Sequence, residues 1–284
     1  MISTRPHLKN VKFGEITQGT VFSCVKLDRY EKYDVLGLVI TARCDIAQLK
    51  FPVLNYLPIV PIRAWFECDG LHILLEREEK DYSAKIRNTL SQAGLSDGIL
   101  ISTSLEDIGS QYFPKNSTGK AQKASKKYWD LVDERNEYNK LRSLNDPKVL
   151  YNWFVKNRTK QIAKIVDDLS KHNLTGFYLF ETLLPARNDG AWVCLLRDVS
   201  FVSKEIAIEI SNGLSLEGLR AMYPTGYQGN LTIAHEELAM PLICVASPTI
   251  EHVMQTFSGL FSRIGLNDPD QVQIECIRND CISV

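Results

Sequence analysis

Residues 37–62 read GLVITARCDIAQLKFPVLNYLPIVPI and belong to the strongest strand pattern in the chain. The apolar, β-branched runs Leu36–Thr41 and Val53–Ile62 predict two neighbouring buried strands. Proline lacks the N–H group that a sheet ladder needs, and the second run is interrupted or preceded by Pro52, Pro58 and Pro61. We therefore expect the second strand to be bulged or to lie at an edge of the sheet.

A compact polar turn joins these two predicted strands. After Thr41, the residues Arg43, Cys44 and Asp45 place a cation, a thiol and a carboxylate at consecutive positions. Arg43 would favour the thiolate form of Cys44, and Asp45 could orient a partner group, as nucleophilic catalysis requires. In the competing interpretation the turn is structural, with Asp45 capping the segment Ile46–Leu49 and Cys44 filling a gap.

The rest of the chain has strand patterns at both ends and helical patterns between them. Helical spacing of apolar residues extends from Asp69 to Ala93 and from Ala124 to Lys171, and Asp146-Pro147 marks a new helix start within the second stretch. A last helix is expected from Ser247 to about Ile264. The apolar residues of 271–284 predict that this tail packs against the rest of the protein. Further strand patterns lie at Thr20–Leu27, Thr175–Leu184, Ala191–Val202, Glu205–Ile210 and Met240–Ala246.

This order of patterns predicts an α+β protein with a discontinuous domain. We expect a barrel-like β domain made of residues 1–68 plus 174–284, with a C-terminal helix, interrupted by a long helical insertion at residues 69–173. The short connection between the two long helices of the insertion implies an antiparallel helical hairpin.

Composition excludes several classes of protein. The chain has 284 residues, of which 44% are hydrophobic and 24% charged, as in ordinary globular proteins. None of the seven cysteines forms a C-x-x-C pair and the five histidines lack metal-ligand spacing, so we expect no metal and no cofactor. The N-terminus has no apolar signal region and no apolar run reaches the length of a membrane span, which predicts a cytoplasmic protein without membrane contact.

The charge is distributed unevenly along the chain. From Lys115 to Lys171 there are 14 Lys or Arg and 7 Asp or Glu, a net charge of +7, whereas the remainder carries −8. Aromatic residues alternate with these cations, an arrangement that can neutralise phosphates and stack bases. The competing interpretation is an amphipathic hairpin with aromatic residues inside and charges in solvent, which also suits docking onto a protein. The candidate contacts to nucleic acid or a partner protein are Lys126, Lys127, Trp129, Lys156, Arg158 and Lys160.

Four short motifs of the β part resemble those of one toxin family. Phe13–Ile16 or Gln18–Val21 is similar to a Gly-Asp-hydrophobic strand start, and Leu38–Thr41 to an apolar strand that ends in Ser or Thr. Leu57–Ile62 and Leu196–Val202 are similar to two later strands. Together they resemble the PemK/MazF-type toxins, which implies an SH3-like barrel that acts as a ribonuclease or binds a partner in a toxin–antitoxin pair.

This chain differs from that family at the position of the family's nuclease arginine. Ribonuclease members place Arg-Pro immediately before the apolar strand, where this chain has Val35-Leu36, and only Thr41 matches the family motif. The sequence Thr-x-x-Cys-Asp from Thr41 to Asp45 is instead similar to a motif of uncharacterised bacterial proteins associated with defence and mobile elements.

Three functions follow from these observations. The first is a non-enzymatic binding or regulatory module of a bacterial defence or toxin–antitoxin-like system, which contacts nucleic acid, a partner protein or both. The second is an endoribonuclease-type toxin, in which Arg43 holds the scissile phosphate, Asp45 acts as general base and Thr41 completes the site. The third is a structural subunit of a larger complex.

Overall fold

The two strongest strand patterns pair with each other at the centre of one antiparallel sheet. The computed structural model describes residues 7–184 and 190–261. Strand β3 (Leu36–Val39) pairs with β4 (Val53–Pro61), with Leu36 opposite Ile59 and Val39 opposite Tyr56. All four residues of β3 are buried, as its continuous apolar run predicts.

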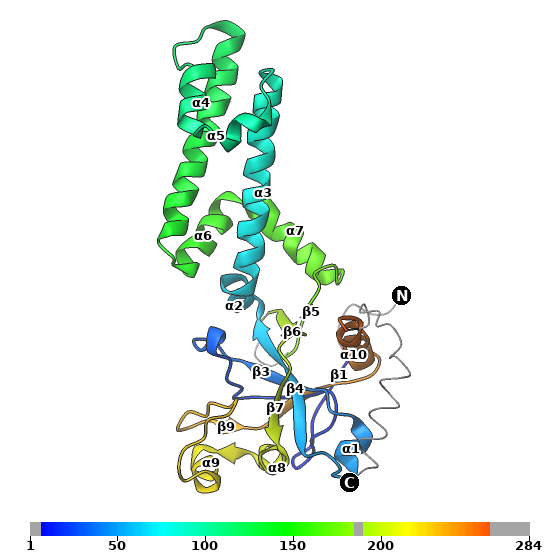
Figure 1. Cartoon of the computed structure of the whole chain (residues 1–284). Helices are drawn as coiled ribbons and strands as arrows, with labels where there is room; N and C mark the ends of the chain where they lie inside the picture. The colour runs from blue at the N-terminus through cyan, green and yellow to red at the C-terminus, as the bar shows by residue number, and fades with distance from the viewer. Residues whose placement is uncertain (1–6, 185–189, 262–284) are drawn as a thin grey trace, which may run out of the picture.

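Six further strands extend this sheet in the order β1-β10-β2-β3-β4-β6-β5, with β7 also paired to β4. The sheet curls into a half-barrel, and α8 (Lys204–Asn212), α9 (Leu216–Met222) and α10 (Thr249–Gly259) lie around it (Figure 1). Strands β8 (Leu214–Ser215) and β9 (Leu238–Ala239) form a separate pair. The bounds of the other sheet strands are β1 Leu8–Lys9, β2 Thr20–Phe22, β5 Phe177–Phe180, β6 Trp192–Leu195, β7 Ser200–Ser203 and β10 Pro241–Val245.

Strand β4 is central, so the prediction of a bulged or edge strand is wrong. Its register against β3 is unbroken, and its other side pairs first with β7 and then with β6. Pro58 lies between the segment that pairs with β7, which ends at Tyr56, and the segment that pairs with β6, which starts at Ile59. A proline is tolerated there because β4 changes partner at that point.

Helices α2 to α7 follow one another between β4 and β5 and project away from the sheet (Figure 1). We call residues 62–170 the helical arm. Its longest elements are α3 and α5, and at 1.5 Å per residue the 24 residues of α3 extend roughly 36 Å. The bounds are α2 Ile62–Glu67, α3 Asp69–Gln92, η2 Asp97–Ile101, α4 Leu105–Tyr112, α5 Gly119–Ser143, α6 Pro147–Asn157 and α7 Thr159–Ser170.

Local signals set the ends of the arm helices. Gly94 adopts φ +75° just after α3, a left-handed conformation that commonly ends a helix and that glycine adopts without strain. Asp146 caps α6, because its Oδ1 accepts from the backbone N–H groups of Lys148 and Val149 at 2.9 and 3.2 Å. The second predicted helix is not continuous, however: it breaks at Arg158, which separates α6 from α7 with φ −136° and ψ 37°.

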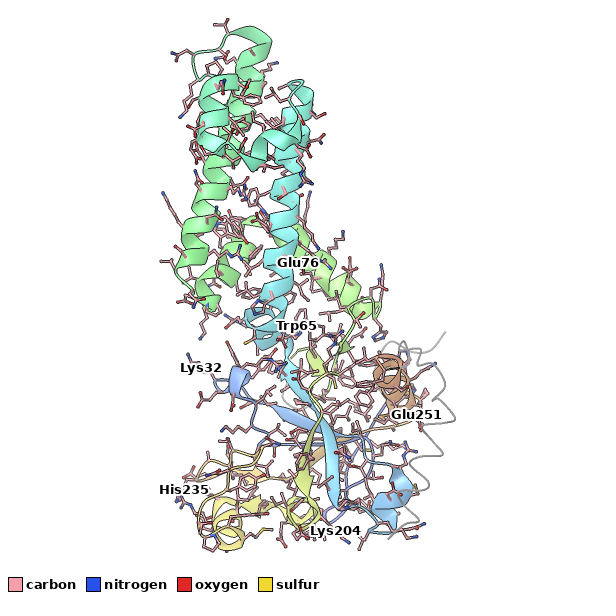
Figure 2. The ribbon with its side chains drawn as sticks, viewed as in Figure 1. Lys32, Trp65, Glu76, Lys204, His235 and Glu251 are labelled. Carbon is pink, nitrogen blue, oxygen red and sulfur yellow. The ribbon has the colours of Figure 1, made fainter. Side chains whose placement is uncertain are left out.

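The base of the arm shares its apolar core with the sheet. Trp65 on α2 is fully buried at the junction (Figure 2) and packs edge-on against Phe177 of β5 with ring centroids 5.1 Å apart. Phe66 stacks on Tyr151 of α6 at 5.6 Å. The buried cluster therefore continues from the sheet into the arm.

The predicted strand at Glu205–Ile210 is wrong, because this segment forms α8. The alternation of polar and apolar residues suggested a strand, but Ser203 accepts from the backbone N–H of Ile206 at 3.4 Å and starts a helix. Ile206 and Ile210 then lie one turn apart on the buried face. The predicted end of the last helix, at about Ile264, lies outside the described residues. The predicted docking of residues 271–284 concerns residues outside them as well.

Candidate functional site

Thr41 closes the loop between β3 and β4. Its Oγ1 accepts a hydrogen bond from the backbone N–H of Asn55 at 2.7 Å, and the Asn55 carbonyl accepts from Ile40 N at 2.9 Å. These contacts fix the points at which the chain leaves one strand and enters the next. The Thr41 hydroxyl therefore serves as a structural acceptor.

Arg43 begins α1 (Arg43–Ala47) and pairs with Glu251 of α10. Its Nη2 lies 3.3 Å from Glu251 Oε1, which also accepts from Ser247 Oγ at 2.6 Å. The hydrogen bond from Ser247 lowers the pKa of the Glu251 carboxyl, and Arg43 lowers it further. Both members of the ion pair are about half exposed, so the pair contributes little to stability.

Cys44 and Asp45 are exposed in the first turn of α1, with Cys44 Sγ 3.5 Å from Asp45 Oδ1. The helix starts at Arg43, with Ala42 in the capping position and no side-chain cap. The prediction that Asp45 caps a helix at Ile46 is therefore wrong, because the chain becomes helical three residues earlier. Asp45 instead places its charge near the positive end of the helix dipole.

Helix α1 and the start of α5 lie at opposite ends of the molecule, whereas α6 and α7 lie at the base of the arm, above the sheet (Figure 1). In the endoribonuclease hypothesis, Arg43 and Asp45 would meet a phosphate beside the basic hairpin. The two cavities described below are lined by neither Arg43 nor Asp45.

Trp129 packs into the outer part of the arm. Its indole Nε1 donates to the Phe113 carbonyl at 2.9 Å, and a Cβ added to Gly109 would lie 2.5 Å from the indole ring. The ammonium group of Lys115 lies 4.4 Å from the ring centroid. The ring is thus occupied by contacts within the arm, and stacking on a nucleic-acid base would require it to leave them.

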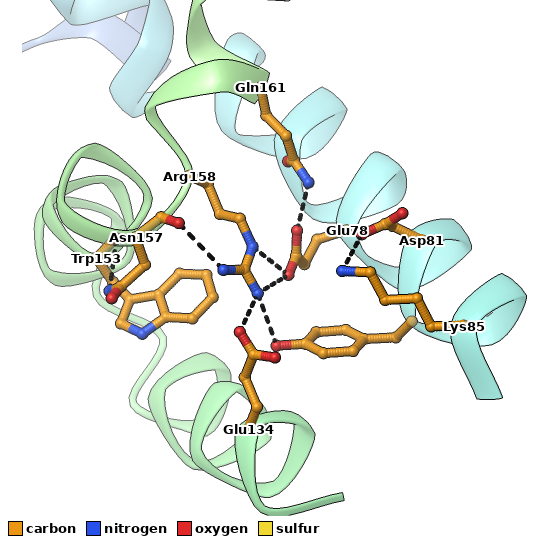
Figure 3. Close-up of polar contacts among 9 residues, drawn as sticks. Glu78, Asp81, Lys85, Glu134, Trp153, Asn157, Arg158 and Gln161 are labelled. Carbon is orange, nitrogen blue, oxygen red and sulfur yellow. Dashed lines mark hydrogen bonds and ion pairs between the residues drawn. The ribbon is translucent and has the colours of Figure 1, made fainter. Parts of the chain in front are cut away.

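Arg158 is the centre of a polar network that joins three arm helices (Figure 3). Its Nε donates to Glu78 Oε1 at 2.7 Å, and its guanidinium also binds Glu134 and the Tyr82 hydroxyl. Only 16% of the Arg158 side chain is exposed, and Glu78 is fully buried. Arg158 is therefore a structural residue, which corrects its selection as a contact to nucleic acid or a partner.

The four predicted lysines remain exposed, but they form two groups. Lys127 reaches Gln92 at the end of α3, whereas Arg158, which lies between Lys156 and Lys160 in the sequence, contacts Glu78. Gln92 and Glu78 are 14 residues apart on one helix, or about 21 Å along its axis. The lysine pairs Lys126/Lys127 and Lys156/Lys160 are thus at two levels of the arm.

Part of the positive charge of the arm is neutralised inside it. Arg135 pairs with Glu79 at 2.8 Å, and Arg77 pairs with Asp168 at 2.7 Å. These pairs join α3 to α5 and α7, because the planar guanidinium fits a carboxylate in a fixed geometry. Arg77 and Arg135 thus hold helices together, whereas Lys126, Lys127, Lys156 and Lys160 are exposed.

A groove of about 560 Å³ that sequence reasoning missed lies between the end of β2, the loop around η1 (Asp28–Tyr30) and β10. Its lining includes Cys24, Lys32, Glu237 and Met240. Cys24 has a left-handed backbone with φ 65°, and burial raises the pKa of its thiol. The sequence gives no signal for this groove, because its walls come from segments about 200 residues apart.

A second missed feature is a cluster of two histidines and a tyrosine where the arm meets α10. The His172 ring stacks on Tyr178 with centroids 4.5 Å apart, and the Tyr178 hydroxyl lies 3.0 Å from His252 Nδ1. Burial lowers the pKa of His172, and His252 lowers it further. No pattern in the sequence points to this contact.

Within the described residues, no group of three or more His, Cys, Asp or Glu is placed to hold a metal ion. Across 7–184 and 190–261, no helix combines the length and apolar character that crossing a bilayer requires.

The chain matches no family model, no curated protein and no solved structure.

Proposed function

We propose that this protein is a cytoplasmic, non-enzymatic binding module of a bacterial defence or toxin–antitoxin-like system, and that its helical arm contacts nucleic acid. In this proposal the curled sheet is an SH3-like, PemK/MazF-type barrel without the nuclease arginine, interrupted by the helical insertion at 69–173. The observation that carries the proposal is the exposure of Lys126, Lys127, Lys156 and Lys160 on a projecting arm.

Exposed lysines suit a contact with the phosphate backbone. Each phosphate that a lysine neutralises releases condensed counterions, so such binding weakens steeply as salt increases. Trp129 and Arg158 are engaged within the arm, which leaves base stacking and bidentate recognition out of the proposal. We therefore expect binding with little sequence preference.

The endoribonuclease alternative has less support from the geometry. Thr41 accepts a structural hydrogen bond and Arg43 is paired with Glu251, so neither group is poised for a phosphate. A cleavage site also needs groups that converge on one reacting atom. The side chains of the α1 turn lie on an open surface instead.

A salt series of nucleic-acid binding tests the proposal. The full-length protein is titrated with a labelled 20-mer RNA and a DNA duplex at several salt concentrations, with gels that show whether the strands stay intact. The charge-reversal variant Lys126→Glu/Lys127→Glu should bind at least tenfold more weakly at low salt. Its plot of log affinity against log salt should be less steep by about 1.4 to 1.8, the contribution of two phosphate contacts.

The matched control reverses two exposed lysines outside the arm, Lys32→Glu/Lys50→Glu, and changes the net charge equally. It should bind within threefold of the wild type. Equal loss in both variants, or no binding by the wild type at 50 mM salt, would overturn the nucleic-acid contact and favour a partner protein. Cleavage that disappears in Arg43→Ala would establish the enzyme instead.

A further inference from the structure

A second cavity, of about 350 Å³, is lined by α9 and the segment 223–233. Helix α9 lies at the end of the molecule opposite the arm (Figure 1). We call it the Tyr227 pocket. Its volume is at the lower end of the roughly 300–1,000 Å³ range of small-molecule sites. The residues that decide its chemistry are Lys26, Arg220, Tyr223, Tyr227, Gln228 and Gly229.

Two aromatic rings form one corner of this pocket. Tyr223 and Tyr227 lie with centroids 5.2 Å apart and ring planes at 60°, and both are half-buried. The Tyr227 hydroxyl occupies the space that a Cβ of residue 229 would need, so a glycine at 229 admits the ring. The close fit over Gly229 holds Tyr227 in place, and burial raises the pKa of its hydroxyl. A fixed aromatic wall of this kind offers a face to a planar ring.

Two cations line the pocket on different elements. Arg220 is exposed on α9, and its guanidinium makes no ion pair or hydrogen bond with the described residues. Lys26 follows β2 and pairs only loosely with Asp28, at 3.5 Å, where Asp28 is itself in solvent. Both charges are thus available to an anion at the mouth of the pocket.

The pocket differs in charge from the neighbouring groove. Lys26 and Thr232 line both cavities, but the groove also contains Lys32 and the carboxylates Glu31, Asp34 and Glu237, so its lining carries a net charge of −1. Of the described residues that line the Tyr227 pocket, none is a carboxylate. An anionic ligand would therefore be held in the pocket and repelled by the groove.

We propose that the Tyr227 pocket binds a nucleotide, with the base against the tyrosine rings and the phosphate between Arg220 and Lys26. Aromatic stacking and cation contact are the two interactions that hold nucleotides without reading their sequence. The nucleotide is either a free nucleoside monophosphate or the terminal unit of a single strand, and both sources present the same chemistry. This inference stands independently of the proposed contact at the arm.

The test is a titration of the full-length protein with AMP, GMP, CMP and UMP. Binding is measured by calorimetry and by the change in tyrosine fluorescence. We expect saturable binding of at least one nucleotide with a Kd below about 1 mM. Arg220→Glu, a surface substitution, should weaken that binding at least tenfold. The control Arg142→Glu reverses an exposed arginine of the arm and should leave it unchanged.

Further titrations distinguish a free nucleotide from the end of a strand, and they include the results that would overturn the proposal. A single-stranded hexamer that binds more tightly than the monophosphates, with the same loss in Arg220→Glu, assigns the pocket to the end of a strand. Binding of inorganic phosphate as tight as that of the nucleotides would overturn the proposal, as would binding of nucleotides that Arg220→Glu does not change, or no binding at 5 mM. Lys126→Glu/Lys127→Glu should keep its nucleotide binding, so failure at the arm and failure at the pocket remain distinguishable.

Discussion

Arg158 Nε donates to Glu78 Oε1 at 2.7 Å, and the carboxylate that it reaches is completely buried. The contact joins the break between α6 and α7 to the middle of α3. A buried carboxylate is costly unless it is paired and hydrogen-bonded, and Glu78 receives a further hydrogen bond from Gln161 (Figure 3). Arg158 therefore helps to hold α3 to the break between α6 and α7, in addition to the pairs Arg135–Glu79 and Arg77–Asp168.

The first prediction concerns removal of that cation. Arg158→Met keeps much of the side-chain length but leaves Glu78 buried without its charge partner, which should lower the free energy of unfolding by about 3–5 kcal/mol. Urea unfolding followed by circular dichroism measures the change. Arg142→Met replaces an exposed arginine of α5 and should change the free energy by less than about 0.5 kcal/mol. Equal effects of the two substitutions would contradict a structural role for Arg158.

The second prediction concerns the contact between Gly109 and Trp129. Alanine favours a helix over glycine by about 1 kcal/mol, so propensity alone predicts that Gly109→Ala stabilises α4. A Cβ at 109 would lie 2.5 and 2.8 Å from the Trp129 ring, however, and must displace the indole from the Phe113 carbonyl. We expect a net loss of about 1–3 kcal/mol and a change in tryptophan fluorescence.

A glycine with room beside it provides the control for this prediction. A Cβ at Gly98 would have its nearest neighbour, Ser96 Oγ, at 3.5 Å, an ordinary contact. Gly98→Ala should therefore leave stability and fluorescence nearly unchanged. A Gly109→Ala protein that is more stable than the wild type would show that the ring moves without cost.

Helix boundaries were predictable where a local signal fixes them. The expected starts of α3 at Asp69 and of α6 at Pro147 are confirmed. At α6 the signal is local, because the capping carboxylate of Asp146 and the proline act within one turn. The break at Arg158 was not predictable, since it depends on Glu78, a residue 80 positions away. The central position of β4 likewise depends on which strands arrive later in the chain.

The surroundings of the candidate site residues depend on contacts that sequence spacing does not reveal. Charge spacing selected Lys126, Lys156 and Arg158 alike as contacts to nucleic acid or a partner, but it could not distinguish the two exposed lysines from Arg158, whose partners lie on other helices. The groove at Cys24 and the Tyr227 pocket are each assembled from distant segments, so no spacing in the sequence reveals them.

The third prediction tests whether Thr41, just before α1, has a structural role. Thr41→Val keeps the shape of the side chain but removes the acceptor for Asn55 N–H, which should cost about 1 kcal/mol or more. Thr41→Ser keeps the hydroxyl and should retain most of that stability. Arg43→Gln breaks an ion pair that is half exposed and should change stability by less than about 0.5 kcal/mol. If Thr41→Val melts at the wild-type temperature, the hydrogen bond is not structural.

The fourth prediction is a pH dependence that comes from His172. Its Nδ1 is buried and finds no hydrogen-bond partner among the described residues, so a proton there would be neither solvated nor paired. Burial and the nearby His252 lower the pKa of His172 in the folded protein below the ordinary value of 6.5. As pH falls through 6.5, the unfolded chain takes up a proton that the folded protein does not, and stability decreases. The loss ends once pH is below the folded pKa.

Unfolding free energies measured in urea at pH 7.5, 6.5 and 5.5 test this sign. His172→Asn should flatten the decrease between pH 6.5 and 5.5, because asparagine does not titrate and tolerates the left-handed backbone that residue 172 adopts, with φ 56°. The substitution also removes the stacking on Tyr178, so absolute stability falls at every pH and only the slope is diagnostic. His235→Asn, at an exposed loop position, should keep the wild-type slope. The opposite result, a wild-type stability that rises as pH falls through 6.5, would contradict this prediction. It would mean that the folded protein binds a proton at His172 and stabilises it.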